Sequence, residues 1–155
     1  MEIRYAREGD IPRLGELLEQ VCRVHNRARP DLFREGGRKY SGGELRQILR
    51  EASRTVLVAE EEGEVVGYAF CEYQRQSGRG AMKEMSTLYL DDLCVDERCR
   101  GRGAGKALYQ AVLGLARAAG CYNVTLNVWE GNESARRFYD KMGLAVQKTC
   151  LEAIV

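Results

Sequence analysis

Apolar residues recur with the spacing of an amphipathic helix in four stretches of the chain. In the first, Leu14, Leu17, Leu18 and Val21 stand at i, i+3, i+4 and i+7, behind a candidate N-cap at Asp10. Similar patterns follow a candidate capping box, a glycine-rich turn and an asparagine cap. We therefore predict four helices: one after Asp10, one over 41–52, one over 104–119, and one from Asn132 to Met142.

Short runs rich in valine and aromatic residues separate these helices and predict strands. The acidic turn EEGE joins two of the runs into a hairpin, and 25–40 and 74–84 have loop composition. The predicted strands are 3–6, 55–60, 65–73, 86–95, 124–129, and one or two closing strands within 144–154. This mixture predicts a single α/β (α+β) domain spanning residues 1–155.

Composition changes this picture little. The 155 residues are 45% hydrophobic and carry a formal net charge of +1, which argues against a protein that coats nucleic acid or an anionic membrane. No apolar signal segment begins the sequence, so a cytoplasmic location is the default expectation. The six cysteines form no CxxC pair and His25 is the one histidine, so we expect no metal site.

Residues 98–108, RCRGRGAGKAL, concentrate glycine and positive charge between a predicted strand and a predicted helix. The first amides of a helix lack internal partners, and glycine allows close backbone approach, so this turn predicts a phosphate or pyrophosphate site. A solvated flexible turn is the alternative. A nucleoside-triphosphate loop is disfavoured because Ala107 follows Lys106, and a dinucleotide loop because Lys106 replaces its third glycine.

Two motifs, in order, resemble the GNAT N-acetyltransferase superfamily. Arg100-Gly101-Arg102-Gly103-Ala104-Gly105 is similar to its [QR]-x-x-G-x-[GA] signature, and NESARRFYDKMGL (132–144) is similar to a later element. The resemblance covers about residues 55–145, and polyamine-type or diamine-type acetyltransferases are the most similar kind. It implies a mixed, mostly antiparallel twisted sheet, flanked by helices, that splays open between strands 86–95 and 124–129.

The resemblance also implies that acetyl-CoA lies in that splay as cosubstrate. Its pyrophosphate would rest on the amides of 101–106, its pantetheine arm on the backbone of 93–95, and Asn132 would cap its helix and contact the arm. One backbone amide of this strand end would bind the thioester carbonyl. The implied cofactor-binding residues are Leu93, Cys94, Val95, Arg100, Gly101, Arg102, Gly103, Ala104, Gly105, Lys106 and Asn132.

Amine acetylation needs a proton acceptor and a proton donor. Asp91 and Asp92 are candidate bases, acting directly or through water, and either can instead be a structural hydrogen-bond acceptor. Successive strand residues face opposite ways, so only one should face the cleft unless a bulge intervenes. By the resemblance, Asp91 occupies the position of the strand carboxylate and Tyr139 points its hydroxyl at the CoA sulfur; without it, Tyr139 would be a core aromatic.

Other residues near the splay have simpler interpretations. An acyl-cysteine mechanism on Cys94 is disfavoured because His25, the one possible histidine base, is remote in sequence. Core packing accounts for Tyr122 and Trp129. By the resemblance, the segment 25–33 contributes to the acceptor pocket.

The leading hypothesis is therefore an acetyl-CoA-dependent N-acetyltransferase acting on a primary amine of a small molecule or peptide. The alternatives are a GNAT-like CoA-binding sensor without turnover and, disfavoured by the failed loop motif, a nucleotide-dependent phosphotransferase. Polyamines, amino acids, amino sugars and protein N-termini stay open as acceptors. The resemblance makes a homodimer possible, and no nucleic-acid or membrane partner is expected.

Overall fold

Five strands form one open sheet in the order β1-β2-β3-β4-β5. The first three pairings are antiparallel and the last, between β4 and β5, is parallel. The computed structural model describes residues 1–155. Its elements are β1 (Glu2–Tyr5), a 3₁₀ turn η1 (Glu8–Asp10), α1 (Ile11–Ala28), α2 (Gly42–Ile48), β2 (Arg54–Glu61), β3 (Glu64–Gln76), β4 (Met85–Val95), a 3₁₀ turn η2 (Glu97–Cys99), α3 (Ala104–Ala118), β5 (Asn123–Thr125) and α4 (Glu133–Lys141).

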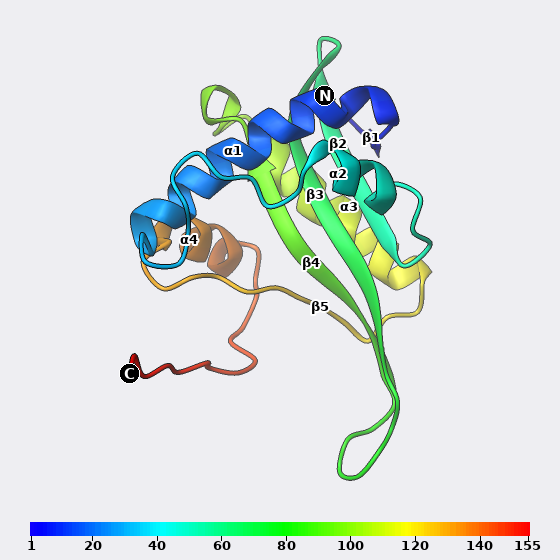
Figure 1. Ribbon diagram of the computed structural model, residues 1–155. Helices are drawn as coiled ribbons and strands as arrows, with labels where there is room; N and C mark the ends of the chain where they lie inside the picture. The colour runs from blue at the N-terminus through cyan, green and yellow to red at the C-terminus, as the bar shows by residue number, and fades with distance from the viewer.

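Helices cover both faces of the sheet (Figure 1). The apolar face of α1, with Leu14, Leu17 and Leu18 fully buried, packs with α2 on one side. On the other side, Leu108 and Val112 of α3 are fully buried against the sheet. The helical spacing in the sequence therefore identified the core correctly on both faces.

Two predicted caps behave differently. Ser41 and Glu44 form the expected capping box at α2, with the Ser41 amide 2.7 Å from Glu44 Oε2. Asp10 stands at the N-cap position of α1, but its carboxylate makes no cap. It accepts hydrogen bonds from Arg4 of β1 instead, at 2.8 and 3.0 Å, and from the Arg7 amide at 2.7 Å.

A β-bulge interrupts the pairing of β3 with β4 at Asp91. Phe70 pairs with Asp92 and Cys71 pairs with Leu90, so Asp91 has no partner on β3. One extra residue reverses the alternation of side chains. Leu90 accordingly lies in the core on the α3 side, whereas Cys94 lies in the core on the α1 side.

β4 and β5 separate soon after they meet. They pair only from Thr87–Asn123 to Tyr89–Thr125, after which the chain from residue 126 leaves the sheet. The predicted strand 124–129 is thus a strand only as far as residue 125. The predicted splay between these strands is confirmed, and it leaves one edge of β4 without a strand partner beyond Tyr89.

The closing strands predicted within 144–154 are absent, and that prediction was wrong. No backbone hydrogen bond involves residues 145–155, and one ion pair, Arg29 with Glu152, ties this segment to the rest of the chain. Figure 1 shows the segment standing away from the sheet. A segment with β-propensity forms a strand only when it pairs with the edge of a sheet, and residues 144–154 do not pair with one. β5 is therefore the edge strand of the sheet. No helix has the length and apolar character needed to cross a membrane.

Candidate functional site

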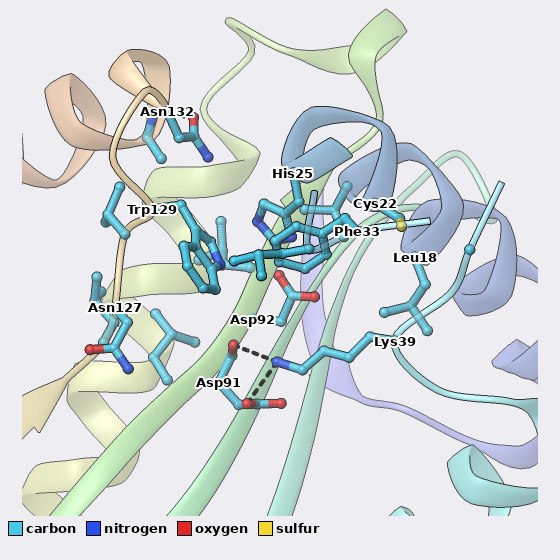
Figure 2. A pocket seen from close by; sticks show the side chains of 18 of the residues that line it. Leu18, Cys22, His25, Phe33, Lys39, Asp91, Asp92, Asn127, Trp129 and Asn132 are labelled. Atoms are coloured by element: carbon cyan, nitrogen blue, oxygen red, sulfur yellow. Dashed lines mark hydrogen bonds and ion pairs between the residues drawn. The ribbon is translucent and has the colours of Figure 1, made fainter. Parts of the chain in front are cut away.

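A pocket of about 490 Å³ lies where β4 and β5 diverge. Its walls come from α1, the α1–α2 loop, the bulged part of β4, the chain after β5, and α4. Figure 2 shows Asp91 and Asp92 of β4 facing into it, below the aromatic side chains of Phe33 and Trp129. The sheet thus opens into a cavity that holds two carboxylates.

The bulge explains why two consecutive acids share this pocket. Without it, Asp91 and Asp92 would point to opposite faces of the sheet. The sequence left the choice between them open, and the structure brings both to the pocket. Their surroundings nevertheless differ, and so does their chemistry.

Asp92 is the buried acid of the pair, at 9% exposure. Its Oδ2 accepts a hydrogen bond from the Tyr68 hydroxyl at 3.1 Å. Burial raises the pKa of Asp92 to about 6, although the Lys39 ammonium and the Tyr68 hydroxyl act in the opposite direction. A carboxyl group with such a pKa is a suitable proton acceptor near neutral pH.

Asp91 is engaged by groups of the chain itself. Its Oδ1 accepts a hydrogen bond from Lys39 Nζ at 2.8 Å, and its Oδ2 accepts one from the Tyr40 hydroxyl at 2.5 Å. Arg54 Nη2 lies 3.7 Å from Oδ2. Both oxygens of Asp91 are thus bonded to other groups of the chain.

Tyr139, on α4, also lines the pocket. Its ring packs edge-on against Tyr109 and Phe138, with centroids 6.2 and 5.1 Å away. No protein group forms a hydrogen bond with its hydroxyl, and burial raises its pKa well above the ordinary value. Tyr139 therefore combines the two interpretations drawn from the sequence: its ring packs on the core, and its protonated hydroxyl is free to donate.

The glycine-rich turn precedes α3 at the end of β4. Gly101 and Gly103 have φ of 79° and 92°, in the left-handed region that favours glycine. Gly103 provides no side-chain cap, and the first backbone hydrogen bond of α3 runs from Ala107 N to Gly103 O. The amides of residues 101–106 are thus without backbone partners, as an anion site requires. Around them, Arg102 lies 3.5 Å from Glu61, and Arg100 Nε donates to the Val95 carbonyl at 3.2 Å.

A buried carboxylate fixes the start of this turn. Asp96 is fully buried, and its side chain accepts a hydrogen bond from Arg13 of α1. It also accepts from the Arg98 amide at 2.9 Å and from Arg98 Nη2 at 3.0 Å. These donors hold the pKa of Asp96 well below its usual range. Asp96 therefore links α1, the end of β4 and the glycine turn.

One residue of the strand end 93–95 reaches the pocket. Leu93 lines the pocket, and Cys94 points the other way, with its Sγ 3.6 Å from the Leu17 carbonyl. Burial raises the pKa of the Cys94 thiol to about 12, so it is not an activated nucleophile. Asn132 caps α4 as expected, its Oδ1 accepting from Ala135 N at 3.2 Å, and it also lines the pocket.

Several pocket residues were not identified from the sequence. Trp129 is 41% exposed and its ring meets that of Phe33 edge-on, with centroids 5.3 Å apart, so core packing was the wrong interpretation. The His25 ring is tilted against that of Phe33, with centroids 5.0 Å apart, and burial lowers the pKa of His25. Lys39 was missed altogether. The only available signal was the loop segment 25–33, which the resemblance placed at the acceptor pocket.

Comparisons with known proteins agree with this geometry. The model of the acetyltransferase (GNAT) family matches residues 18–144. Glucosamine 6-phosphate N-acetyltransferase of Trypanosoma brucei brucei is 30% identical over 148 residues, covering 92% of this chain and 88% of that protein. The solved structure of a tetramutant of the BH1408 protein from Bacillus halodurans is 30% identical, with a TM-score of 0.95 and full coverage of both chains.

A more distant structure shows the same fold. An aminoglycoside N-acetyltransferase, AAC(6')-Iy in complex with CoA, is 16% identical, with a TM-score of 0.73, and the match covers 99% of this chain and 98% of that one. The match of the family model to most of the sequence, together with the bulged and splayed sheet, leads to one conclusion. The chain belongs to the GNAT acetyltransferase family.

Proposed function

We propose that this acetyltransferase moves the acetyl group of acetyl-CoA to a primary amine, by direct attack of the amine on the thioester. The observation that carries this proposal is the convergence of Asp92 and Tyr139 on one pocket at the β4–β5 splay. One is a buried carboxylate and the other a protonated phenol with a free hydroxyl. They match the proton acceptor and proton donor that amine acetylation requires.

Two features of the chain suit acetyl-CoA and support it as the cosubstrate. The unpartnered amides of 101–106 suit a diphosphate, and Arg100, Arg102 and Lys106 add positive charge around them. Beyond Tyr89, β4 has an unpaired edge on the side of the splay, where backbone groups are available to the amides of a pantetheine arm. A solved structure of the same fold holds CoA.

Asp92 would act on the amine. A primary amine with a pKa near ~10 is mostly protonated at pH 7, and freeing its lone pair costs roughly 4 kcal/mol. A carboxylate with a pKa of about 6 is ionised at that pH and accepts the proton, directly or through a water molecule. Asp91 is the weaker candidate because its oxygens are already engaged.

Tyr139 would act on the leaving group. As the C–N bond forms and the C–S bond breaks, the sulfur of CoA gains negative charge. A free thiol has a pKa of about 8.5, so a proton donor helps it to depart. The Tyr139 hydroxyl can supply that proton because its raised pKa keeps it protonated.

Two measurements test this proposal. Calorimetric titration should show binding of acetyl-CoA and CoA, and none of ATP. Thiol release should then follow when an amine panel is added: polyamines, amino acids, short peptides, and amino sugars, including the substrate named for the trypanosomal relative. Tight binding of acetyl-CoA without thiol release from any amine would favour a CoA sensor instead, and no binding would refute both functions.

A further inference from the structure

Asp91 forms part of a small cradle of groups that suit an ammonium ion. Its Oδ1 and its backbone carbonyl oxygen lie 2.8 and 3.1 Å from one nitrogen, Lys39 Nζ. The Tyr40 ring adds an aromatic face, with its centroid 5.7 Å from the same nitrogen. A carboxylate, a carbonyl and an aromatic face are the three features that bind an alkylammonium group. Figure 2 shows the Lys39 side chain reaching Asp91 across the pocket.

The rest of this cradle is fixed independently of Lys39. The Tyr40 ring packs 5.5 Å from that of Phe70, and its hydroxyl bonds both to Asp91 and to Arg54, the latter at 2.8 Å. The side chains of Asp91 and Arg54 are 13% and 16% exposed. The two Asp91 oxygens that accept hydrogen bonds from Lys39 therefore keep their positions if the lysine leaves.

Lys39 is the more exposed partner of its ion pair with Asp91. Its side chain is 39% exposed, and it belongs to the irregular segment between α1 and α2. The Asp91 side chain is 13% exposed, so its charge needs another cation beside it if Lys39 leaves. A ligand with a similar cationic group can replace it at little cost.

The position of Lys39 Nζ relative to Asp92 bears on the proposed reaction. Lys39, Asp91 and Asp92 all line the same pocket, and Asp91 directly precedes Asp92 in β4. An amine bound in the cradle would therefore stand beside the group proposed to accept its proton. In the free protein, the ammonium group of Lys39 occupies this position beside Asp91.

We propose that Asp91 Oδ1, the Asp91 carbonyl oxygen and the Tyr40 ring bind the primary alkylammonium group of the acceptor, and that Lys39 fills this subsite in the free enzyme. This inference rests on the proposed function. The incoming ammonium displaces Lys39 and gives one proton to Asp92. Its lone pair forms the C–N bond as the C–S bond breaks, and the thiolate takes a proton from Tyr139. The nitrogen loses its second proton on becoming an amide, and that proton restores the Tyr139 hydroxyl through solvent.

The experiment measures affinity rather than turnover. n-Butylamine, which reproduces the aminoalkyl arm of a lysine, is titrated calorimetrically at pH 7 into CoA-saturated wild-type protein and into Lys39→Met. Methionine keeps most of the apolar stem and removes the ammonium. We expect n-butylamine to bind Lys39→Met about three- to tenfold more tightly, because the subsite is no longer partly filled.

Controls separate this effect from others. Lys83→Met, which removes the same charge from the distant β3–β4 loop, should leave the affinity unchanged. Asp91→Asn in the Lys39→Met background should remove the gain, with thermal unfolding showing that the double variant folds. Neutral n-butanol should not distinguish wild type from Lys39→Met.

The proposal is overturned if Lys39→Met binds n-butylamine no better than wild type does, if neither protein binds it, or if the gain survives Asp91→Asn. These results do not depend on thiol release. An enzyme that acetylates amines can fail this test. Conversely, a protein that turns over no amine refutes the proposed function whatever its affinity for n-butylamine.

Discussion

The hydroxyl of Tyr68, on β3, lies 3.1 Å from Oδ2 of Asp92, on β4, and both side chains are buried. One hydrogen bond from a neutral phenol does not offset the burial of a carboxylate, and the pKa of Asp92 is accordingly raised to about 6 from an ordinary 3.8. The same burial that suits Asp92 to its proposed role as a base therefore lowers the stability of the protein. Both consequences can be measured.

Asp92→Asn should stabilise the fold at neutral pH. A raised carboxyl pKa means that the native state holds the proton more tightly than the unfolded state, so Asp92 reduces stability progressively as pH rises from about 4 to about 6. Asparagine removes this penalty, which amounts to at most about 3 kcal/mol for a shift of about two pKa units. Denaturant unfolding should show the gain at pH 7.5 and little gain at pH 4.

Asp91→Asn is the matched control for that result. The Asp91 carboxylate is bonded to Lys39 and Tyr40, with Arg54 nearby, so its replacement should lower stability at pH 7.5. Equal effects of the two substitutions would show that the buried charge of Asp92 is not the cause.

The kcat measured at saturating acceptor should fall as pH decreases through about 6. The charged and hydrogen-bonding groups that shift the pKa of Asp92 are Lys39 from the α1–α2 loop, Tyr68 from β3, and Asp91 and the Leu93 amide from β4. Once Asp92 is protonated, it cannot accept a proton from the amine, so kcat should drop about tenfold per pH unit on this limb. A kcat that stays level from pH 7 to pH 5 would exclude Asp92 as the base.

Tyr139→Phe should lower kcat about 100-fold and leave the affinity for acetyl-CoA nearly unchanged. The ring packs on Tyr109 and Phe138, and phenylalanine preserves those contacts. Only the hydroxyl, which no protein group binds, is lost. Steady-state kinetics and calorimetric titration measure the two quantities separately.

Tyr109→Phe provides the comparison for Tyr139. Tyr109 is buried against the same ring but does not line the pocket. Its variant should keep wild-type kcat. A Tyr139→Phe enzyme as active as the wild type, under conditions where chemistry limits turnover, would remove Tyr139 from its proposed role.

The features that the sequence predicted correctly depend on residues that are close together in the chain. The apolar spacing predicted the buried faces of α1 and α3, and these predictions are confirmed. The glycines before α3 have the positive φ angles that glycine favours. The bulge at Asp91 depends on how β4 pairs with β3, which no single strand encodes. Likewise, Lys39 and Asp91 are 52 positions apart, so only the fold brings them together.

Gly103→Ala should weaken acetyl-CoA binding about tenfold and change the KM for the acceptor little. Gly103 has φ of 92°, immediately before the first residue of α3, and a side chain there costs about 1–2 kcal/mol. The turn can relieve that strain only by moving the amides of 101–106. Calorimetric titration with acetyl-CoA tests this expectation.

Gly114→Ala is the matched control, because Gly114 lies within α3 with nothing near its Cβ position and has an ordinary φ. It should leave binding unchanged and raise helix stability slightly. If both alanine variants bound acetyl-CoA like the wild type, the shape of the glycine turn would not determine affinity for it.

Asp96→Asn should destabilise the protein by about 3 kcal/mol and also weaken acetyl-CoA binding. The carboxylate is fully buried between Arg13 and Arg98, and removing its charge takes from Arg13 its buried partner at the start of the glycine turn, leaving the guanidinium with Glu16 and the Val65 carbonyl. Arg13→Met should be costly for the converse reason. The double variant should lose less than the sum of the two single losses, because each single substitution already removes the contact between Asp96 and Arg13. Denaturant unfolding at pH 7 measures all three, with Glu97→Gln, an exposed acid in η2, as the neutral control.

Strictly additive losses would show that Asp96 and Arg13 stabilise the fold independently. An Asp96→Asn protein with wild-type affinity for acetyl-CoA would show that their contact does not shape the glycine turn.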